Sequence, residues 1–396
     1  MASWEAFRIS LRRELAWLKS NFWHWGMISV LPLIFSLLLW DLFSLQIPRD
    51  LSIGVVDLDN TSITRHLIRY LDASPGLAVT NRFSSQKEAE SALRSGTVVA
   101  VLFIPKHLTQ SVKTQRRAEL VLQHNAQFGT HSPLVQRDVR KAVATLSAGV
   151  KINIKVKRGA TPQTAVDTVN PLQVVLVPMF NRSSNYQIYL AGALIPTLLH
   201  IVAMLTGAYI FGRELKDRTL GKWLSRYRSS PTLSILLGAI AGKILPSLIA
   251  FSLQGLLFLY LFEGVLKASG VALIENILGM VFFFSVCLLL GACFSLLTRS
   301  LRLGLTISSF ISAPAFTFSG IGFPMESFPS FAVIWAKLLP LTHYLSLQVN
   351  LLQIGIPTLE ALPVLLGFLF YALLLLILLQ WLVQLANRHP ETWGAR

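Results

Sequence analysis

Six apolar segments, each long enough to cross a lipid bilayer, constrain the fold of this chain more than any other feature. A helix needs about 20 apolar residues to span the hydrocarbon core. The first five segments begin near Met27, Tyr186, Ile244, Ile274 and Gly304. The sixth runs from about Leu359 to Leu385. Of the 396 residues, 53% are hydrophobic and only 14% are charged, which is typical of an integral membrane protein. We therefore predict an α-helical polytopic membrane protein with six transmembrane helices.

Lys and Arg residues are distributed unevenly over the short connections between these segments. They are frequent before the first segment, between the second and third, between the fourth and fifth, and after the sixth. The opposite connections carry little beyond Lys267 and Lys337. Because cytoplasmic loops carry the excess of Lys and Arg, both termini are predicted to be cytoplasmic. The first segment is too long for the core of a signal peptide and lacks a small-x-small cleavage site, which indicates a retained anchor. The formal net charge of +16 reflects this topology and a basic outer domain, not nucleic-acid binding.

A polar segment, residues 47–185, separates the first two apolar segments and is predicted to form an extracytoplasmic α/β domain. Strands are predicted at 51–59, 77–83, 98–105 and 118–125, on runs rich in Val, Ile and Leu. Helices are predicted at 61–74, 84–96 and 132–149. Ser or Thr begins the first two of these helices, and Gly96 and Gly149 end the last two. The alternation of strands and helices is typical of a small α/β domain inserted between two spans.

The end of this polar segment is markedly basic. The whole segment holds 18 Lys and Arg residues against nine Asp and Glu residues. Within it, Lys151–Gly159 reads KINIKVKRG, in which basic and apolar residues alternate as in an edge strand protected by lysines. Two interpretations stay open: a solvated edge, or a surface that docks another protein.

The N-terminal residues 1–23 have an amphipathic helical pattern, ahead of the first transmembrane helix predicted at 24–46. Apolar residues recur at steps of three and four, at Trp4, Phe7, Leu11, Leu15, Leu18 and Phe22. Arg8, Arg12 and Lys19 lie opposite them. This pattern predicts an interfacial helix lying on the inner leaflet, either as a plain membrane anchor or as a contact for a partner protein.

The second and third apolar segments are joined by a basic stretch, GRELKDRTLGKWLSRYRSSP, Gly212–Pro231. Its apolar and aromatic residues fall on one helical face and its basic residues on another, which predicts an amphipathic helix at about 213–230. From periodicity alone, two interpretations stay open. The stretch is either an ordinary positively charged loop, or a helix on the inner surface with Trp223 and Tyr227 at the interface.

Three motifs occur in an order that resembles type-2 ABC exporter permeases. The basic stretch resembles the segment in which an Arg-Glu pair, an acidic residue and Thr-Leu precede Ser-Pro. NRSSNYQIYLAGALIP resembles the Asn-aromatic start of the second span, and GIGFPMESFPSFAVIWAKLLPLTHYL the Pro-punctuated element between spans five and six. The outer domain resembles that of the bacterial drug-export subgroup, so the resemblance covers nearly the whole chain. In one departure, Arg218 stands where the family usually has Gly before the Thr.

This resemblance implies that the basic stretch is a coupling helix that fits a cleft of a separate ATPase subunit. No segment matches the phosphate loop GxxxxGK[ST], so this chain is expected to bind no cofactor and to have no enzymatic activity of its own. ATP and Mg²⁺ would be bound by the dimeric ATPase. A second copy of the permease, or a related one, is expected to complete the pore. The ATPase contact is expected at Arg213, Glu214, Asp217, Arg218, Thr219 and Trp223.

Polar residues inside apolar spans are costly and are therefore candidate functional residues. His200 lies midway along the second span, where it either bonds a neighbouring helix or faces the substrate. Asp41, near the outer end of the first, either caps that helix or contacts substrate. The fifth span is rich in hydroxyl groups, and the family's spans one, two and five line the dimer interface. The translocation path is expected to include Asp41, Tyr189, His200, Thr306, Ser309 and Thr317.

The segment 324–352 is interrupted by prolines and charges, so it is not predicted to be a seventh span. A re-entrant or interfacial element on the outer side is expected instead. In the family, outer helices gate the exit. The outer gate is therefore expected to include Pro324, Glu326, Pro340 and His343.

Three classes of function are compatible with the sequence. The first is the permease of an ABC exporter in the bacterial inner membrane, moving amphipathic small molecules or lipids. Its outer domain would lie in the periplasm, where Lys151, Lys155, Lys157 and Arg158 could dock a periplasmic adaptor protein. The second is a receptor or scaffold without transport activity. The third, a membrane-embedded enzyme, is disfavoured because no catalytic motif is found, and no metal site is expected since the spacing of His124, His131 and Asp138 matches no standard site.

Overall fold

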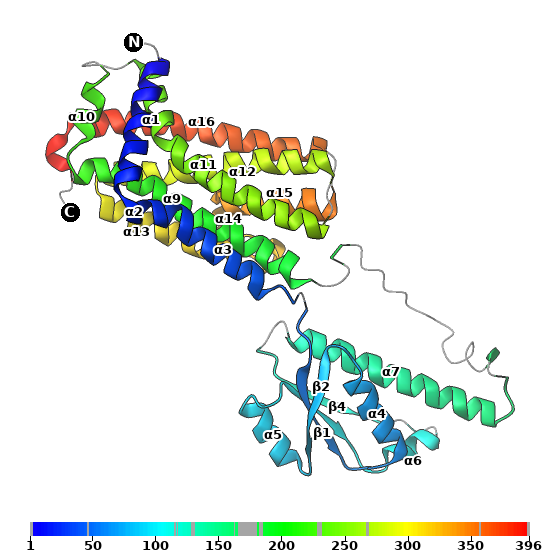
Figure 1. Ribbon diagram of the computed structural model, residues 1–396. Coiled ribbons are helices and arrows are strands. Elements are labelled where there is room, and N and C mark those ends of the chain that lie inside the picture. Colours follow the sequence, from blue (N-terminus) through cyan, green and yellow to red (C-terminus); the bar gives the residue numbers. More distant parts are fainter. Residues whose placement is uncertain are drawn as a thin grey trace. The chain divides into compact units, whose positions relative to one another are not determined.

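The computed structural model describes residues 3–45, 47–114, 116, 118–127, 131–161, 163–164, 180–181, 185–227, 232–266, 269–355 and 358–393, without the side chains of 263–266 and 358. The chain divides into two compact units, one formed by Met1–Gln46 with Pro178–Arg396 and the other by Ile47–Val177. The first unit is helical and the second contains the β-sheet (Figure 1). Much of the segment between residue 165 and the predicted end of the outer domain at 185 lies outside the described residues.

Five helical segments of the first unit are long and apolar enough to cross a membrane. They are Phe22–Leu42, Gln187–Lys216, Leu233–Phe262, Gly270–Thr298 and Leu359–Arg388. The elements that form these segments are α2 (Phe22–Trp25), η1 (Gly26–Val30), α3 (Leu31–Leu42), η2 (Gln187–Ala191), α9 (Gly192–Lys216), α11 (Leu233–Leu266), α12 (Gly270–Thr298) and α16 (Thr358–Arg388). The prediction of a polytopic helical membrane protein is confirmed to this extent.

The fifth predicted span is shorter than the others. It consists of α13 (Leu301–Ser312) and the 3₁₀ turn η3 (Ala313–Phe316). An apolar helix over Leu301–Phe316 is about 24 Å long at 1.5 Å per residue, against about 30 Å for the hydrocarbon core. Pro314 cannot donate a backbone hydrogen bond, which favours the end of the regular helix at this point. Six full-length spans are therefore not confirmed.

The proline-rich segment 324–352 is broken into short helices, as predicted. These are the 3₁₀ turn η4 (Met325–Ser327), α14 (Ser330–Leu338), α15 (Pro340–Val349) and η5 (Asn350–Ile354). Pro340 occupies the first turn of α15, where its missing N–H has no intrahelical partner in any case. The 3₁₀ turn η6 (Pro390–Thr392) follows α16.

The N-terminal helix α1 (Ser3–Ser20) forms as predicted, but its buried face is not the apolar one. Its buried residues are Ala6, Ser10 and Glu14, at intervals of four. Trp4 and Leu15 are exposed instead. The reason is close contact with α11 along small residues: a Cβ at Gly238 would overlap the carbonyl oxygen of Ser3, and one at Gly242 that of Phe7. Small residues four apart let two helix backbones approach closely.

The second unit contains a four-stranded sheet with the order β2-β1-β3-β4. β1 is parallel to β2 and β3, and β3 is antiparallel to β4. The strands are β1 (Leu51–Asp57), β2 (Leu77–Phe83), β3 (Ala100–Ile104) and β4 (Val121–His124). The helices are α4 (Ser62–Asp72), α5 (Gln86–Arg94), α6 (Leu108–Lys113) and α7 (His131–Lys157). All four strands and the first two helices agree in position with the prediction.

The alternation of side chains along the strands explains why helices pack on both faces of this sheet. Ile53 and Val55 pack with residues of α4 and α7, whereas Val56 packs with Ala89 of α5 on the opposite face. Successive side chains of a strand point to opposite faces, so each face has its own small core. Thr61 and Ser85 accept hydrogen bonds at the starts of α4 and α5, as the sequence indicated.

The predicted edge strand at Lys151–Gly159 is wrong, because this stretch continues α7 to Lys157. The predicted helix end at Gly149 is wrong for the same reason. None of the residues 151–158 is buried, so no packing surface selects the strand period. A helix that has already formed extends at low cost. Lys151, Lys157 and Arg158 are exposed there, and Lys155 is half-buried.

Candidate functional site

The basic stretch between the second and third spans folds as the end of α9, a tight turn and the short helix α10 (Leu220–Ser225). In the turn, the N–H of Arg218 donates to the carbonyl of Leu215 at 3.2 Å, and that of Thr219 to the carbonyl of Glu214 at 2.8 Å. This pair of bonds is the Schellman motif that commonly ends a helix. Arg218 occupies its left-handed position with φ 53°, where glycine is favoured. The departure from the family pattern at Arg218 therefore leaves the turn intact. Residues 228–230 of the predicted helix lie outside the described residues.

Arg218→Gly is expected to raise the thermal midpoint of the purified protein. A non-glycine residue in the left-handed region costs about 1–2 kcal/mol. Glycine avoids this cost, but its greater conformational freedom in the unfolded chain offsets part of the gain in stability. Arg226→Gly is the matched control, because Arg226 has a right-handed helical conformation with φ −65°. A midpoint lowered equally in both variants would contradict the strain argument.

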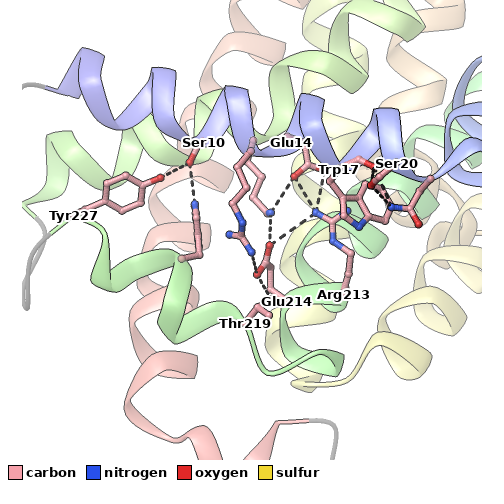
Figure 2. A network of polar contacts seen from close by, with 12 residues as sticks. Ser10, Glu14, Trp17, Ser20, Arg213, Glu214, Thr219 and Tyr227 are labelled. Carbon is pink, nitrogen blue, oxygen red and sulfur yellow. Dashed lines mark hydrogen bonds and ion pairs between the residues drawn. The ribbon is translucent and has the colours of Figure 1, made fainter.

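Five charged side chains form a buried network beside this turn (Figure 2). Nη2 of Arg213 donates to both carboxylate oxygens of Glu14, at 3.1 and 2.9 Å. Nζ of Lys243 lies 2.7 Å from Glu214 and 3.2 Å from Glu14, and Nη2 of Arg13 lies 2.8 Å from Glu214. The hydroxyl of Thr219 also donates to Glu214. The network joins α1 to α9 and α11, and its contacts with α1 link residues 199 and 229 positions apart in the sequence.

The burial of these charges requires that they be paired. Lys243 is 1% exposed and Glu214 is fully buried, and an isolated charge in such a position is strongly unfavourable. Two carboxylates compensate three cations, of which Arg13 keeps the most solvent contact. The guanidinium of Arg213 also lies 3.6 Å from the centre of the Trp17 ring, a cation–π contact.

A second set of hydrogen bonds attaches α10 to α1. The indole Nε1 of Trp223 donates to Oγ of Ser10 at 2.9 Å. Oγ of Ser10 and the Tyr227 hydroxyl are 2.7 Å apart. Trp223 and Tyr227 are both buried. The aromatic side of the basic stretch therefore packs against α1 inside this chain.

This packing corrects part of the expected ATPase contact. Glu214 and Trp223 do not reach the surface, and Arg213 is almost entirely buried. Thr219 is half-buried. The side chains that the turn and α10 expose are Lys216, Asp217, Arg218, Lys222, Ser225 and Arg226. Ser10, Glu14 and Lys243 were not predicted as functional residues from the sequence. A charge inside an apolar run, as at Lys243, is the signal that could have indicated the network.

An open groove of about 930 Å³ lies between the first span, α9 and α13. Of the expected path residues, Thr306 and Ser309 line it, together with His24, Thr206 and Tyr209. The remaining lining residues are apolar, and Phe310 at its edge is 76% exposed. A mostly apolar groove with a few polar groups is typical of a site for small organic molecules.

The other expected path residues do not line this groove. His200 is fully buried and stacks on Phe283, and neither ring nitrogen has a hydrogen-bond partner among the described residues. The hydroxyl of Tyr189 donates to the carbonyl of Ile321 at 2.9 Å. Asp41 and Thr317 are exposed.

The expected gate residues are only partly brought together. Pro324 and Glu326 line a pocket of about 360 Å³ with Thr342 of α15. His343 is exposed, and its Nε2 lies 2.8 Å from the carbonyl oxygen of Lys337. In the described part of the chain, no three His, Cys, Asp or Glu residues are grouped as a metal site, and Cys287 and Cys293 are buried free thiols.

Comparison with known proteins gives a family match over most of the chain. A family model described as ABC-2 family transporter protein matches residues 22–382. The chain is 23% identical over 302 residues to ABC transporter G family member 20 of Dictyostelium discoideum, which covers 75% of this chain and 39% of that protein. It is 26% identical over 98 residues to the linearmycin resistance permease protein LnrN of Bacillus subtilis (strain 168), or 25% of each chain. The match thus spans less than half the length of either relative. No solved structure matches.

Proposed function

Because the chain belongs to the ABC-2 family of transporter proteins, we propose that it is the transmembrane subunit of an ATP-driven exporter. It would move amphipathic small molecules or lipids out of the cytoplasm or inner membrane, and a separate ATPase dimer would bind and hydrolyse ATP with Mg²⁺. The observation that carries this proposal is the α9–α10 turn. It exposes charged side chains at the end of a long apolar helix, and buried ion pairs attach it to two other helices.

The exposed face of this turn is the proposed ATPase contact. Asp217, Arg218, Lys222 and Arg226 would meet the ATPase subunit directly. Glu214 and Trp223 would act as positioning residues, since they hold the turn against α11 and α1. A rigid attachment of this kind passes a displacement of the turn to the spans.

Charge reversal on this face should reduce binding of the ATPase subunit. Lys222→Glu with Arg226→Glu reverses two exposed charges, one on α10 and one directly after it. The change is expected to weaken co-purification at least tenfold, because like charges brought together at an interface cost several kcal/mol. Lys87→Glu with Lys106→Glu, in the second unit, is the control for net charge. If the wild type and both variants bind the ATPase subunit equally, this face is not part of the interface. If none of them binds an ATPase subunit, the result favours a receptor or scaffold without transport activity.

The groove beside α13 is the proposed substrate route, closed by a second permease copy. Phe310, at 76% exposure, and Met27, at 53%, leave it open in one chain. An isologous dimer formed by the same surface of both copies would bury these side chains.

Filling this groove should abolish transport while assembly persists. Ser309→Trp places a large ring among the lining residues and is expected to lower ATP-dependent efflux from reconstituted vesicles at least tenfold, without loss of the bound ATPase subunit. Leu373→Trp, at an exposed position of α16, is the matched control. Efflux that is unchanged by Ser309→Trp would exclude the groove as the route.

The second unit is proposed to lie in the periplasm and to dock an adaptor protein through the exposed basic end of α7. Lys151 and Lys157 are exposed on this helix and Arg158 is exposed directly after it. Complementary acidic charge on the adaptor would steer the encounter. A pull-down with these residues and Lys155 changed to Glu tests the proposal. If the charge reversal and the salt concentration both leave adaptor binding unchanged, the basic end of α7 is a solvated helix end and not a docking surface.

A further inference from the structure

A second groove lies between the N-terminal helices and α11, and it shares only Ile28 with the lining of the proposed substrate route. It has a volume of about 560 Å³. Its apolar lining includes Leu15, Leu18, Phe22 and Trp25 on one side and Ile249 and Ala250 of α11 on the other. Phe22 is 75% exposed and Trp25 49%, so the groove is open along an aromatic edge. Trp is enriched where a membrane protein meets the lipid interface.

Lys19 is the charged residue of this groove. The lining residues include this one cation and no carboxylate. Lys19 is exposed and makes no ion pair within the described part of the chain, whereas Arg13, Arg213 and Lys243 nearby in the fold are all paired with carboxylates. A free ammonium group beside an apolar groove matches the two parts of an anionic phospholipid, a phosphate and an acyl chain.

We propose that this groove holds one acyl chain of an anionic phospholipid whose phosphate is bound by Lys19. The apolar side chains of Ile249 and Ala250 provide van der Waals contact for the acyl chain, the interaction by which apolar surfaces associate inside a membrane. Serine side chains complete the lining, and Oγ of Ser29 donates to the carbonyl of Trp25 at 2.7 Å. The hydroxyl of Ser29 therefore has no free hydrogen-bond donor facing the acyl chain.

The position of the groove gives the lipid a structural role. One wall is the C-terminal half of α1, the helix whose Glu14 is paired with Arg213 and Lys243. A lipid seated there packs against the same helix that holds the α9–α10 turn. Its binding does not depend on the transport function proposed above and is tested by itself.

Native mass spectrometry of the delipidated full chain measures this binding directly. Phosphatidylglycerol and phosphatidylcholine with identical acyl chains are titrated separately. We expect a first adduct of phosphatidylglycerol about fivefold tighter than that of phosphatidylcholine, the effect of about 1 kcal/mol for one basic residue at an anionic lipid. Lys19→Gln should remove this preference, and Ala250→Phe should weaken the first adduct of both lipids.

Matched controls separate a site from general lipid contact. Arg12→Gln removes an exposed cation of α1 that does not line the groove, and Leu253→Phe enlarges an exposed residue of α11 outside it. Both should bind as the wild type does. If Ala250→Phe does not fold, Ala250→Leu fills the groove less severely. Equal affinity for both lipids in the wild type, or an equal loss in Arg12→Gln and Lys19→Gln, would overturn the proposal.

Discussion

Lys243→Met should destabilise the protein by about 3–5 kcal/mol, the usual effect of removing one partner from a buried ion pair. Methionine keeps most of the volume but leaves Glu14 and Glu214, both almost fully buried, without the ammonium group that lies between them. The unfolding free energy can be measured by titration with sodium dodecyl sulfate in mixed micelles. Lys222→Met, at an exposed position of α10, should change it by less than about 0.5 kcal/mol.

A double substitution tests whether the network acts as a unit. Glu214→Gln added to Lys243→Met removes the carboxylate that Lys243 contacts at 2.7 Å, so the cost of the double substitution should be smaller than the sum of the two single costs by about 1–3 kcal/mol. Additive costs would mean that Lys243 and Glu214 contribute independently. That result would also weaken the proposal that this network passes motion from the α9–α10 turn to the spans.

Gly291→Ala should disrupt the packing of the membrane unit, at a cost of about 3 kcal/mol, the upper end of the usual range for overpacking. A Cβ at Gly291 of α12 would overlap the carbonyl oxygen of Met204 of α9, and one at Gly207 would overlap the carbonyl oxygen of Leu288. Each helix therefore meets the backbone of the other, which cannot move aside as a flexible side chain can. The fraction of monodisperse protein in fluorescence-detected size-exclusion chromatography measures the effect.

Gly367→Ala is the control for this substitution and should have the opposite sign. Gly367 lies in α16, and a Cβ there would have no atom within 4 Å. Alanine in place of glycine stabilises a helix interior by about 0.5–1 kcal/mol. Similar losses for Gly291→Ala and Gly367→Ala would contradict the close crossing of α9 and α12.

Local patterns in the sequence predicted most of the second unit. Strand period and helix caps depend on neighbouring residues: Thr61 and Ser85 stand at the starts of α4 and α5 as expected. The prediction of a strand at Lys151–Arg158 was wrong, because alternating basic and apolar residues favour a strand only where one face is buried. No residue of that stretch is buried, and α7 continues through it.

The apolar segments could also be predicted from the sequence, because hydropathy and length are properties of the sequence alone. Five of the six runs give helices long enough to span a membrane, whereas the fifth run in sequence order gives only Leu301–Phe316 and is shortened near Pro314. The buried face of α1 could not be predicted in this way. Its apolar wheel indicated the side of Trp4 and Leu15, whereas contact with Gly238 and Gly242 selected the side of Ala6 and Ser10.

The sequence by itself determined that this chain is a helical membrane protein with a polar α/β insertion and a charged turn between two spans. Only the tertiary structure decided which charges of that turn are buried. Glu214 and Trp223 pair with Lys243 and Ser10, which are 29 and 213 positions away in the sequence. Burial of a polar group depends on what packs over it, and that is fixed by contacts between helices, not by the period of any one of them.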